Sequence, residues 1–400
     1  MDRKTWMLAV GVMGIAHIFV ACQQLEPLAP KEDAVLDGPV EGLTGEENEM
    51  HLRGDVAFND EVFTPGTGLG PRFVATSCGS CHAGDGKGHP FTTLTRFGQS
   101  EPGVNAFTGT GGPQLQNRAI PGFTPEQLPP GAPFAKFTPP INTGLGFLDL
   151  VSDADILAMA DPADADHDGI SGEPNWIVLP AYARPRAGAI TQGGRYIGRF
   201  GKKANAYDLL QQTVQAYSED IGIASAFLPV DVYSQEEIDP EVSNATVNVV
   251  VFYLKTLKAP VQRNRSDPDV LAGEKIFTDT QCAGCHSPRL KTGPSPISAL
   301  SQRTFAPYTD LLLHDMGPGL NDGYTEGNAR ASEWRTPPLW GLGLAPNSQG
   351  GEYFLLHDGR ARSIEGAILL HSGEASRSVD RFRQLSPAER QQLITFLESL

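Results

Sequence analysis

The sequence predicts a mainly α fold with two tandem modules and long loops rich in glycine and proline. Three observations predict it. The pentapeptide pattern Cys-x-x-Cys-His occurs twice, at residues 78–82 and 282–286. An amphipathic segment precedes each copy, and another ends each half of the chain. The 44 glycines and 32 prolines exceed average usage, which indicates extensive loops between the helices.

Each pentapeptide has the spacing of covalent c-type haem attachment. Two thiols three positions apart can add to the two vinyl groups of one porphyrin, while the next histidine is held against its iron. The motifs therefore predict two covalently bound haems, one in each of two cytochrome c-like modules. The residues are Cys78, Cys81 and His82 in the first motif, and Cys282, Cys285 and His286 in the second.

Two other kinds of site also use a Cys-x-x-Cys pair. A zinc ribbon brings its second pair about 15 to 20 residues after the first, whereas the pairs here stand at 78–81 and 282–285. A thioredoxin-like redox pair lies near a βαβ pattern, and neither pair does. Haem attachment is the interpretation that we prefer, with zinc binding and a redox disulfide as the alternatives.

A weak internal repeat indicates how each module begins and ends. Residues 52–58, before the first motif, resemble residues 271–277, before the second. The closing segments 251–257 and 394–400 also match, and the last one follows a capping box that begins at Ser386. We therefore expect an opening helix and a closing helix around each haem.

The same repeat predicts the domain boundaries. Pro260 ends one helix and Pro268 can start the next, so the joint lies between them. We expect an N-terminal cytochrome c-like haem domain at residues 51–262 and a C-terminal one at residues 263–400. The first is the longer, because it carries a loop insertion from about residue 100 to residue 200.

The N-terminus predicts export and a lipid anchor. Residues 1–21 have a short basic start and an apolar stretch that ends in Ala21, and the run before Cys22 resembles a bacterial lipobox. A cleaved signal peptide or an uncleaved anchor is the alternative, although the stretch is short for a membrane span. We expect a lipoprotein signal peptide, lipidation of Cys22 and a flexible tether at residues 22–50, rich in proline and acidic residues.

Localisation and partners follow from the anchor and the charge. The protein is expected to be lipid-anchored and to face the periplasm, on the outer membrane if the host is Gram-negative. Its net charge of −16 argues against nucleic acid as a partner. An acidic surface suits a small soluble electron donor or acceptor of the cytochrome c or cupredoxin type.

One run in the loop insertion resembles a calcium-binding loop. Asp164, Asp166 and Asp168 followed by glycine have the Asp-x-Asp-x-Asp-Gly spacing of an EF-hand, in which alternate carboxylates face one cation. The position of the bidentate glutamate is occupied by Asn175, however. Calcium binding and an acidic solvated turn are both open.

Each haem iron also needs a sixth ligand or an open position. His82 and His286 supply one axial ligand each. The other seven histidines and the methionines are the remaining candidates, and a lone histidine is more often a surface or hydrogen-bonding residue than a ligand. By composition alone the candidates are His314, Met316, His357 and His371.

The two motifs are accompanied by segments that resemble the di-haem oxidoreductase family. These segments are Gly-Arg-Phe-Gly at 198–201, His-Asp-Met-Gly-Pro-Gly at 314–319, Trp-Arg-Thr-Pro-Pro-Leu-Trp-Gly at 334–341, and His-Asp-Gly at 357–359 followed by residues 367–375. The resemblance runs from about residue 50 to the C-terminus. The family is described as peroxidases or thiol oxidoreductases and is related to bacterial di-haem cytochrome c peroxidases and MauG.

The resemblance implies the ligands of the second haem. In the cytochrome c peroxidases a methionine follows the His-(Asn/Asp)-Gly run and binds the C-terminal haem, and this chain has His371 there. His286 and His371 are the implied ligands, with Met316 as the alternative. Family members often have tryptophan where this chain has Lys202. If that tryptophan relays electrons, Trp176 or Trp334 must replace it.

The first haem is where chemistry is expected. No methionine closely follows His82, and His89 stands among glycines, where a loop residue is expected rather than a ligand. With the resemblance, this predicts a di-haem c-type cytochrome that reduces hydrogen peroxide at the N-terminal haem with electrons received through the C-terminal haem. The alternatives are a non-enzymatic electron-transfer cytochrome c and, with less support because no cysteine is left over, a thiol or sulfur-compound oxidase. The catalytic residues are not identified by the sequence.

Overall fold

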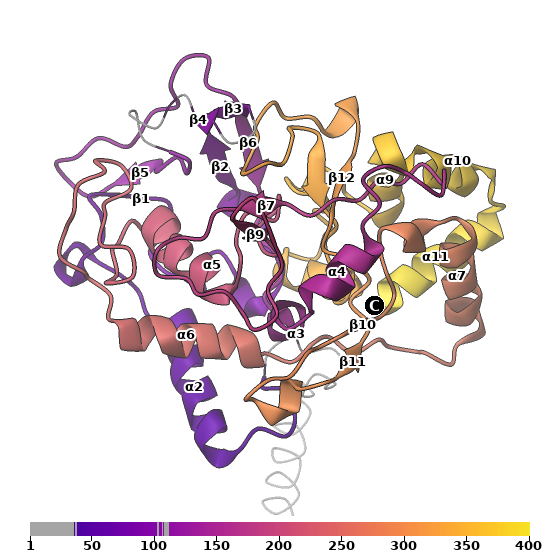
Figure 1. Ribbon diagram of the computed structural model, residues 1–400, viewed down its shortest axis with the longest axis horizontal. Coiled ribbons are helices and arrows are strands. Elements are labelled where there is room, and N and C mark those ends of the chain that lie inside the picture. The colour runs from indigo at the N-terminus through magenta and orange to yellow at the C-terminus, as the bar shows by residue number, and fades with distance from the viewer. Residues whose placement is uncertain (1–35, 37, 102–103, 106, 108–111) are drawn as a thin grey trace, which may run out of the picture. The chain divides into compact units, whose positions relative to one another are not determined.

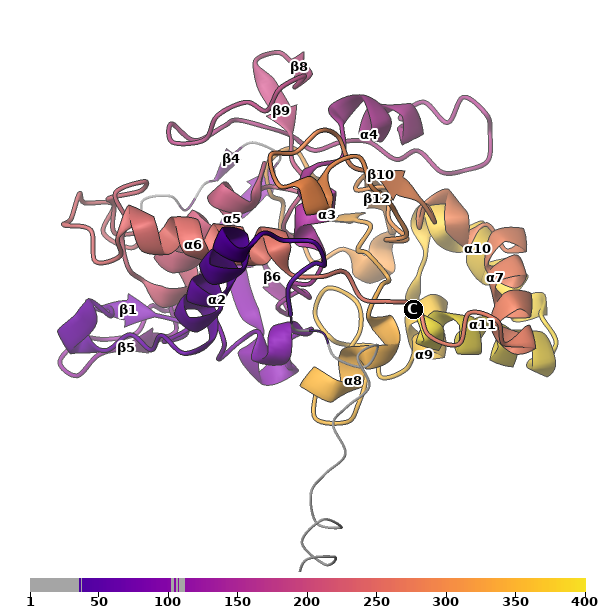
Figure 2. The same ribbon diagram turned by 90° about the horizontal axis from the view of Figure 1, so that it is seen from below.

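Two helix pairs of the same design enclose the two motifs in the computed structural model. Helix α2 (Gly45–Asn59) packs on α6 (Asn244–Thr256), and α7 (Pro268–Asp279) packs on α11 (Pro387–Ser399), as Figures 1 and 2 show. All four predicted opening and closing segments fall on these helices, with only Leu257 and Leu400 just past the ends of α6 and α11. The capping box predicted at Ser386 is confirmed, because its hydroxyl accepts from the Glu389 N–H at 3.3 Å and Glu389 accepts from the Ser386 N–H at 2.8 Å.

A glycine at the same place in each pair lets the helices approach closely. A Cβ atom on Gly54 would lie 2.2 Å from the carbonyl oxygen of Val249, and one on Gly273 would lie 2.1 Å from that of Gln392. No side chain larger than hydrogen fits at these distances. The repeat in the sequence therefore encodes the same close crossing twice.

The structure describes residues 36, 38–101, 104–105, 107 and 112–400, and Leu36–Leu400 belongs to one unit. Cys22 and the predicted signal peptide lie outside the described residues. The predicted tether extends to residue 50, but α2 begins at Gly45. Thr44 and Glu47 form a capping box there, with hydrogen bonds of 3.2 and 2.7 Å.

The remaining elements are short. The further helices are α3 (Leu145–Asp149), α4 (Asp153–Met159), α5 (Leu209–Gln215), α8 (Ala345–Ser348), α9 (Ile364–Leu370) and α10 (Ser376–Gln384). A π-helix, Ala216–Ile221, continues α5. The strands are β1 (Arg72–Phe73), β2 (Leu94–Phe97), β3 (Gln99–Glu101), β4 (Val104–Asn105), β5 (Arg118–Ala119), β6 (Phe134–Phe137), β7 (Trp176–Ile177), β8 (Thr191–Gln192), β9 (Arg195–Ile197), β10 (Leu290–Lys291), β11 (Thr304–Phe305), β12 (Leu313–Asp315) and β13 (Glu333–Arg335).

These strands overturn the prediction of a mainly α fold of tandem cytochrome c-like modules. Only 35% of residues are helical and 13% are in strands. The strands of the described residues pair antiparallel, as β1–β5, β2–β6, β3–β4, β10–β11, β12–β13 and β7–β9–β8. The frequent glycines and prolines keep the chain from forming long helices, and short antiparallel ladders pair the backbone of the connecting segments instead.

The largest buried cluster combines residues from both sides of the predicted joint. Tyr253 and Leu257 of the first part share it with Leu311 and Trp340 of the second. A second cluster lies around the α7–α11 pair and includes Phe277 and Phe396. The boundary between residues 262 and 263 stays a prediction.

Candidate functional site

Both Cys-x-x-Cys-His motifs open onto one cavity with a volume of about 420 Å³. Its wall is mainly apolar and includes the four cysteines and two histidines of the two motifs. Phe58 of α2 packs on the His82 ring at 6.0 Å between centroids, and Phe277 of α7 packs on the His286 ring at 6.5 Å. The paired helices thus support equivalent histidines in the same way.

A tight turn directs both thiols of each motif to the same side. The His82 N–H donates to the carbonyl of Cys78 at 3.1 Å, and the His286 N–H donates to that of Cys282 at 3.0 Å. Burial raises the pKa of Cys78 to about 12 and that of Cys81 to about 11. None of the four cysteines forms a disulfide within the described part of the chain, so the motifs present neutral thiols to the cavity.

The two motif histidines have the same polar environment. Nδ1 of His82 lies 3.0 Å from the carbonyl oxygen of Pro140, and Nδ1 of His286 lies 2.9 Å from that of Tyr308. A carbonyl can only accept, so Nδ1 carries the proton and Nε2 keeps its lone pair. Burial lowers the pKa of both histidines to about 4. Each imidazole is therefore neutral, in the form that binds iron.

His371 repeats this pattern on the same cavity wall. It caps the C-terminus of α9, and its Nδ1 lies 2.7 Å from the carbonyl oxygen of Ala367. Burial lowers its pKa, and its charge also lowers the pKa of His286, which lines the same cavity. Met316, the alternative ligand, lines the same cavity.

Three other histidines have ring nitrogens that are hydrogen-bonded to other groups of the chain. His314 has Asp310 at 2.8 Å from Nε2 and Glu374 at 2.7 Å from Nδ1, which leaves no lone pair for a metal. His357 has Asp322 at 2.7 Å from Nε2. His89 accepts from the Phe91 N–H at the start of a 3-10 helix and is not part of the cavity wall.

Of the two tryptophans suggested as electron relays, Trp334 lies on the cavity wall. Its ring stacks on His357 with 3.7 Å between centroids and 10° between planes. The ammonium of Lys203 lies 3.8 Å from the ring centroid. Trp176 lies in β7 and does not line the cavity.

Asp220 is a carboxylic acid on the cavity wall that sequence reasoning missed. It belongs to the π-helix 216–221, a rare element that is frequent at functional sites. Its backbone carbonyl accepts from Val74 and Ala75 at 2.9 Å, which fixes the turn. Burial raises its pKa to about 7, and its charge raises the pKa of Cys78. An acid that changes protonation near neutrality therefore stands beside the first motif.

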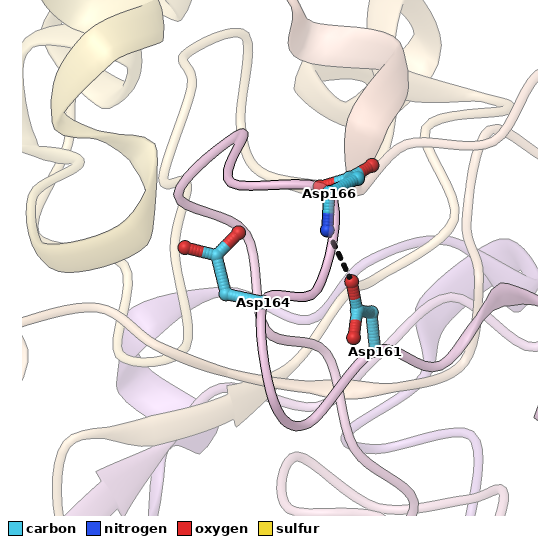
Figure 3. Close-up of side chains that lie close together, drawn as sticks. All are labelled: Asp161, Asp164 and Asp166. Carbon is cyan, nitrogen blue, oxygen red and sulfur yellow. Dashed lines mark hydrogen bonds between the residues drawn. The ribbon is translucent and has the colours of Figure 1, made fainter.

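The acidic loop gathers a different trio of carboxylates from the predicted one. Asp161, Asp164 and Asp166 bring ligand oxygens within 4.8 Å of one another, as Figure 3 shows. Asp168 instead accepts from the Ile170 N–H at 2.8 Å. Asn175 is fully buried and hydrogen-bonded to Lys203, Glu326 and Asn328. The loop is therefore not an EF-hand, and Asp161 was missed because it precedes the repeat of alternate aspartates.

A zinc site is not formed by the cysteines. Among residues 36–400 that the structure describes, only the Asp161–Asp164–Asp166 group brings three histidine, cysteine or carboxylate ligand atoms together. Tetrahedral zinc needs four such atoms. The two motifs therefore stay separate, each with its own pair of thiols and its own imidazole.

Two equivalent motifs share one cavity, and each offers two thiols and a neutral imidazole to it. The chain belongs to the di-haem oxidoreductase family, because residues 135–400 match the family model described as "Di-haem oxidoreductase, putative peroxidase". The family implies haem cofactors, and the site fits them: the wall is apolar, and His82 and His286 offer neutral imidazoles whose Nε2 atoms have no hydrogen-bond partner among the described residues.

Solved structures show only distant likeness. Hydrazine synthase of Kuenenia stuttgartiensis is 16% identical with a TM-score of 0.40, and the match covers 94% of each chain. A MauG-like protein associated with microbial copper homeostasis is 13% identical with a TM-score of 0.39, covering 94% of this chain and 95% of the other. No curated protein matches the sequence. Neither structure is similar enough to support a function.

Proposed function

We propose that the protein is a c-type di-haem oxidoreductase that reduces hydrogen peroxide at the centre formed by Cys78, Cys81 and His82. The observation that carries the proposal is a difference between the motifs. His286 shares the wall with a second neutral imidazole, His371, whereas the first motif has Asp220 nearby. One closed centre that receives electrons and one reactive centre with an acid beside it suit the reduction of peroxide.

The chain's own residues would have different roles at the two centres. The cysteines of each motif would hold a haem by thioethers, and the haem at the first motif would supply the redox chemistry for peroxide. At the first centre Asp220 takes a proton from the incoming peroxide and returns one to the departing oxygen, which its pKa of about 7 permits at neutral pH. At the second centre His286 and His371 would hold the haem, which would supply electron transfer there.

Electron paramagnetic resonance of the purified protein tests this division. The proposal expects one high-spin and one low-spin haem, cyanide binding at one iron, and peroxide consumption with a reduced small electron-transfer protein. Two low-spin haems that bind no cyanide in any redox state would make the protein an electron carrier instead. Turnover of thiols without peroxide consumption would favour the thiol oxidase alternative.

Covalent attachment is tested separately by mass spectrometry. The intact chain should carry the mass of two haems, and a variant with Cys282→Ala and Cys285→Ala should carry one. The Cys78→Ala and Cys81→Ala variant should retain the other haem. A native chain with bound zinc, or with one haem, would contradict the proposal.

Anchoring and location remain part of the proposal. Cys22 would carry the lipid, and the haem domain would face the periplasm and a small soluble electron-transfer protein. No helix among the described residues has the length and apolar character to cross a membrane. Cys22→Ser should release the protein into the soluble periplasmic fraction, and unchanged membrane retention would refute the anchor.

We also propose that the loop at residues 161–168 binds calcium through Asp161, Asp164 and Asp166. The proximity of the three carboxylates supports it, and hard oxygen ligands are those that calcium prefers. Calorimetric titration should show one site, abolished by Asp164→Asn and unaffected by Asp60→Asn on the exposed end of α2. Equal binding by both variants would leave the loop an acidic turn.

A further inference from the structure

Three basic side chains lie on the wall of the mainly apolar cavity. They are Lys87, Lys202 and Arg335, and Asp220 is the one acidic residue among those that line the cavity. Lys87 follows the first motif in the same loop, and Lys202 follows β9. Arg335 ends β13, and its backbone N–H donates to the carbonyl of Lys202 at 3.0 Å. Three cations thus converge from separate parts of the chain.

None of the three forms an ion pair with a described residue. The Lys87 ammonium donates to the carbonyl of Leu356 at 3.2 Å, and Arg335 donates to the carbonyls of Gly201 and Thr336 at 3.0 and 3.1 Å. The Lys202 ammonium has no hydrogen-bond partner within the described part of the chain. Asp358, whose charge acts on Lys87 and Lys202, is already paired with Arg360 at 2.6 Å.

The neighbouring Lys203 is a buried lysine whose ammonium is fully hydrogen-bonded. Its ammonium donates to the carbonyls of Arg330, Ala331 and Glu333 at 2.9, 3.2 and 2.7 Å. All three of its protons therefore have acceptors. Lys202, next to it in sequence, has none, so the two adjacent lysines have different roles.

Three basic side chains in an apolar cavity without an ion pair to any described residue are costly. Burial lowers the pKa of Lys202 far below its ordinary value, and the charges of Lys87 and Arg335 lower it further. Buried charges in proteins are normally paired. The cavity therefore calls for carboxylates beyond those that the described residues supply.

We propose that Lys87, Lys202 and Arg335 bind the propionate groups of the haem attached at Cys78 and Cys81. This inference rests on the proposed function, which places that haem in the cavity. Each haem carries two propionates, and an arginine with two lysines offers the charge and the donors to bind them. Lys87 lies in the loop of the first motif, and the charge of Lys202 acts on His82, so the first haem is the one in reach.

The test compares Lys202→Met with the charge-preserving Lys202→Arg. Lys136→Met is the matched control, because Lys136 is exposed on β6 and lies outside the cavity. Mass spectrometry first establishes that every variant keeps two haems. The readouts are the reduction potential of the first haem and the propionate vibrations in its resonance Raman spectrum.

Lys202→Met should lower the potential of the first haem and shift its propionate bands. An uncompensated propionate stabilises the oxidised iron, which carries one more positive charge than the reduced iron. Lys202→Arg should keep both values close to those of the native protein, and Lys136→Met should leave them unchanged. Lys87→Met should shift the potential in the same direction.

Two outcomes would overturn the assignment, and only the first leaves the proposed function standing, because the second requires a low-spin first haem. If no propionate contacts the amine, Lys202→Met would give the same reduction potential and propionate bands as Lys136→Met. Conversion of a low-spin first haem to high-spin by Lys202→Met would make the lysine an iron ligand instead. A native protein without attached haem would refute the proposed function itself, which the mass measurement reveals before any variant is compared.

Discussion

His314 lies between two carboxylates, with Nδ1 2.7 Å from Glu374 and Nε2 2.8 Å from Asp310. The Sγ atom of Cys285 is also 3.6 Å from Nδ1. Glu374 in turn accepts from the backbone N–H groups of Ser171 and Asp315 at 2.9 Å. The second motif, β12, the acidic loop and the segment after His371 are thereby connected through one buried, charged imidazole.

Glu374→Gln should destabilise the protein by about 3 kcal/mol, because it removes one partner of a buried ion pair. The hydrogen bonds to Asp310, Cys285 and Glu374 raise the pKa of His314 well above 6.5 despite the opposing effect of burial. Its stabilisation is therefore complete below pH 6.5 and is lost as pH rises through the higher pKa of the folded state. Thermal unfolding measured as a function of pH should show a smaller loss of stability at alkaline pH in Glu374→Gln than in the native protein.

Glu352→Gln is the control, because Glu352 pairs with Arg362 on the exposed surface and such pairs contribute about 0–1 kcal/mol. Equal melting temperatures for Glu374→Gln and Glu352→Gln would show that the His314 network does not stabilise the fold.

Gly54→Ala should destabilise the α2–α6 crossing by about 1–3 kcal/mol, because the new methyl group overlaps the Val249 carbonyl and forces the helices apart. Gly45→Ala, in the same helix, meets no atom within 4 Å and should change stability little. Chemical denaturation measures both. Similar effects of the two substitutions would refute the close-crossing explanation.

His371→Ala should convert the second haem from low-spin to high-spin or water-ligated and shift its potential. His89→Ala should leave the spectrum nearly unchanged, because His89 lies outside the cavity wall. Electron paramagnetic resonance distinguishes the states. If Met316→Leu produces the spin change and His371→Ala does not, the alternative ligand is the correct one.

Asp220→Asn should lower peroxide turnover by about 10²- to 10⁴-fold, since it removes the group that moves the proton. In the native protein the rate should rise with pH through about 7, as Asp220 loses its proton and can accept one from peroxide. The variant should lack this rise. Asp60→Asn should keep both rate and profile, and loss of activity without a changed profile would indicate a merely structural role for Asp220.

Local patterns in the sequence were enough to find the parts of the site that lie close together along the chain. The two pentapeptides, the four helices around them and the capping box at Ser386 are short-range features. Turn geometry and helical periodicity act over a few residues, so spacing alone predicts them. His371 was found through family resemblance, because nothing local distinguishes it from His314.

Tertiary structure alone decided what lies between these parts. It places both motifs on one cavity and brings Asp220 to the first motif. It also leaves the Lys202 ammonium without a partner among the described residues, while that of Lys203 is fully hydrogen-bonded. Burial and long-range contacts determine these properties, and both depend on segments far apart in sequence. The same reason explains why the mainly α prediction was wrong: antiparallel pairing such as that of β12 with β13 has no short-range signature in loops rich in glycine and proline.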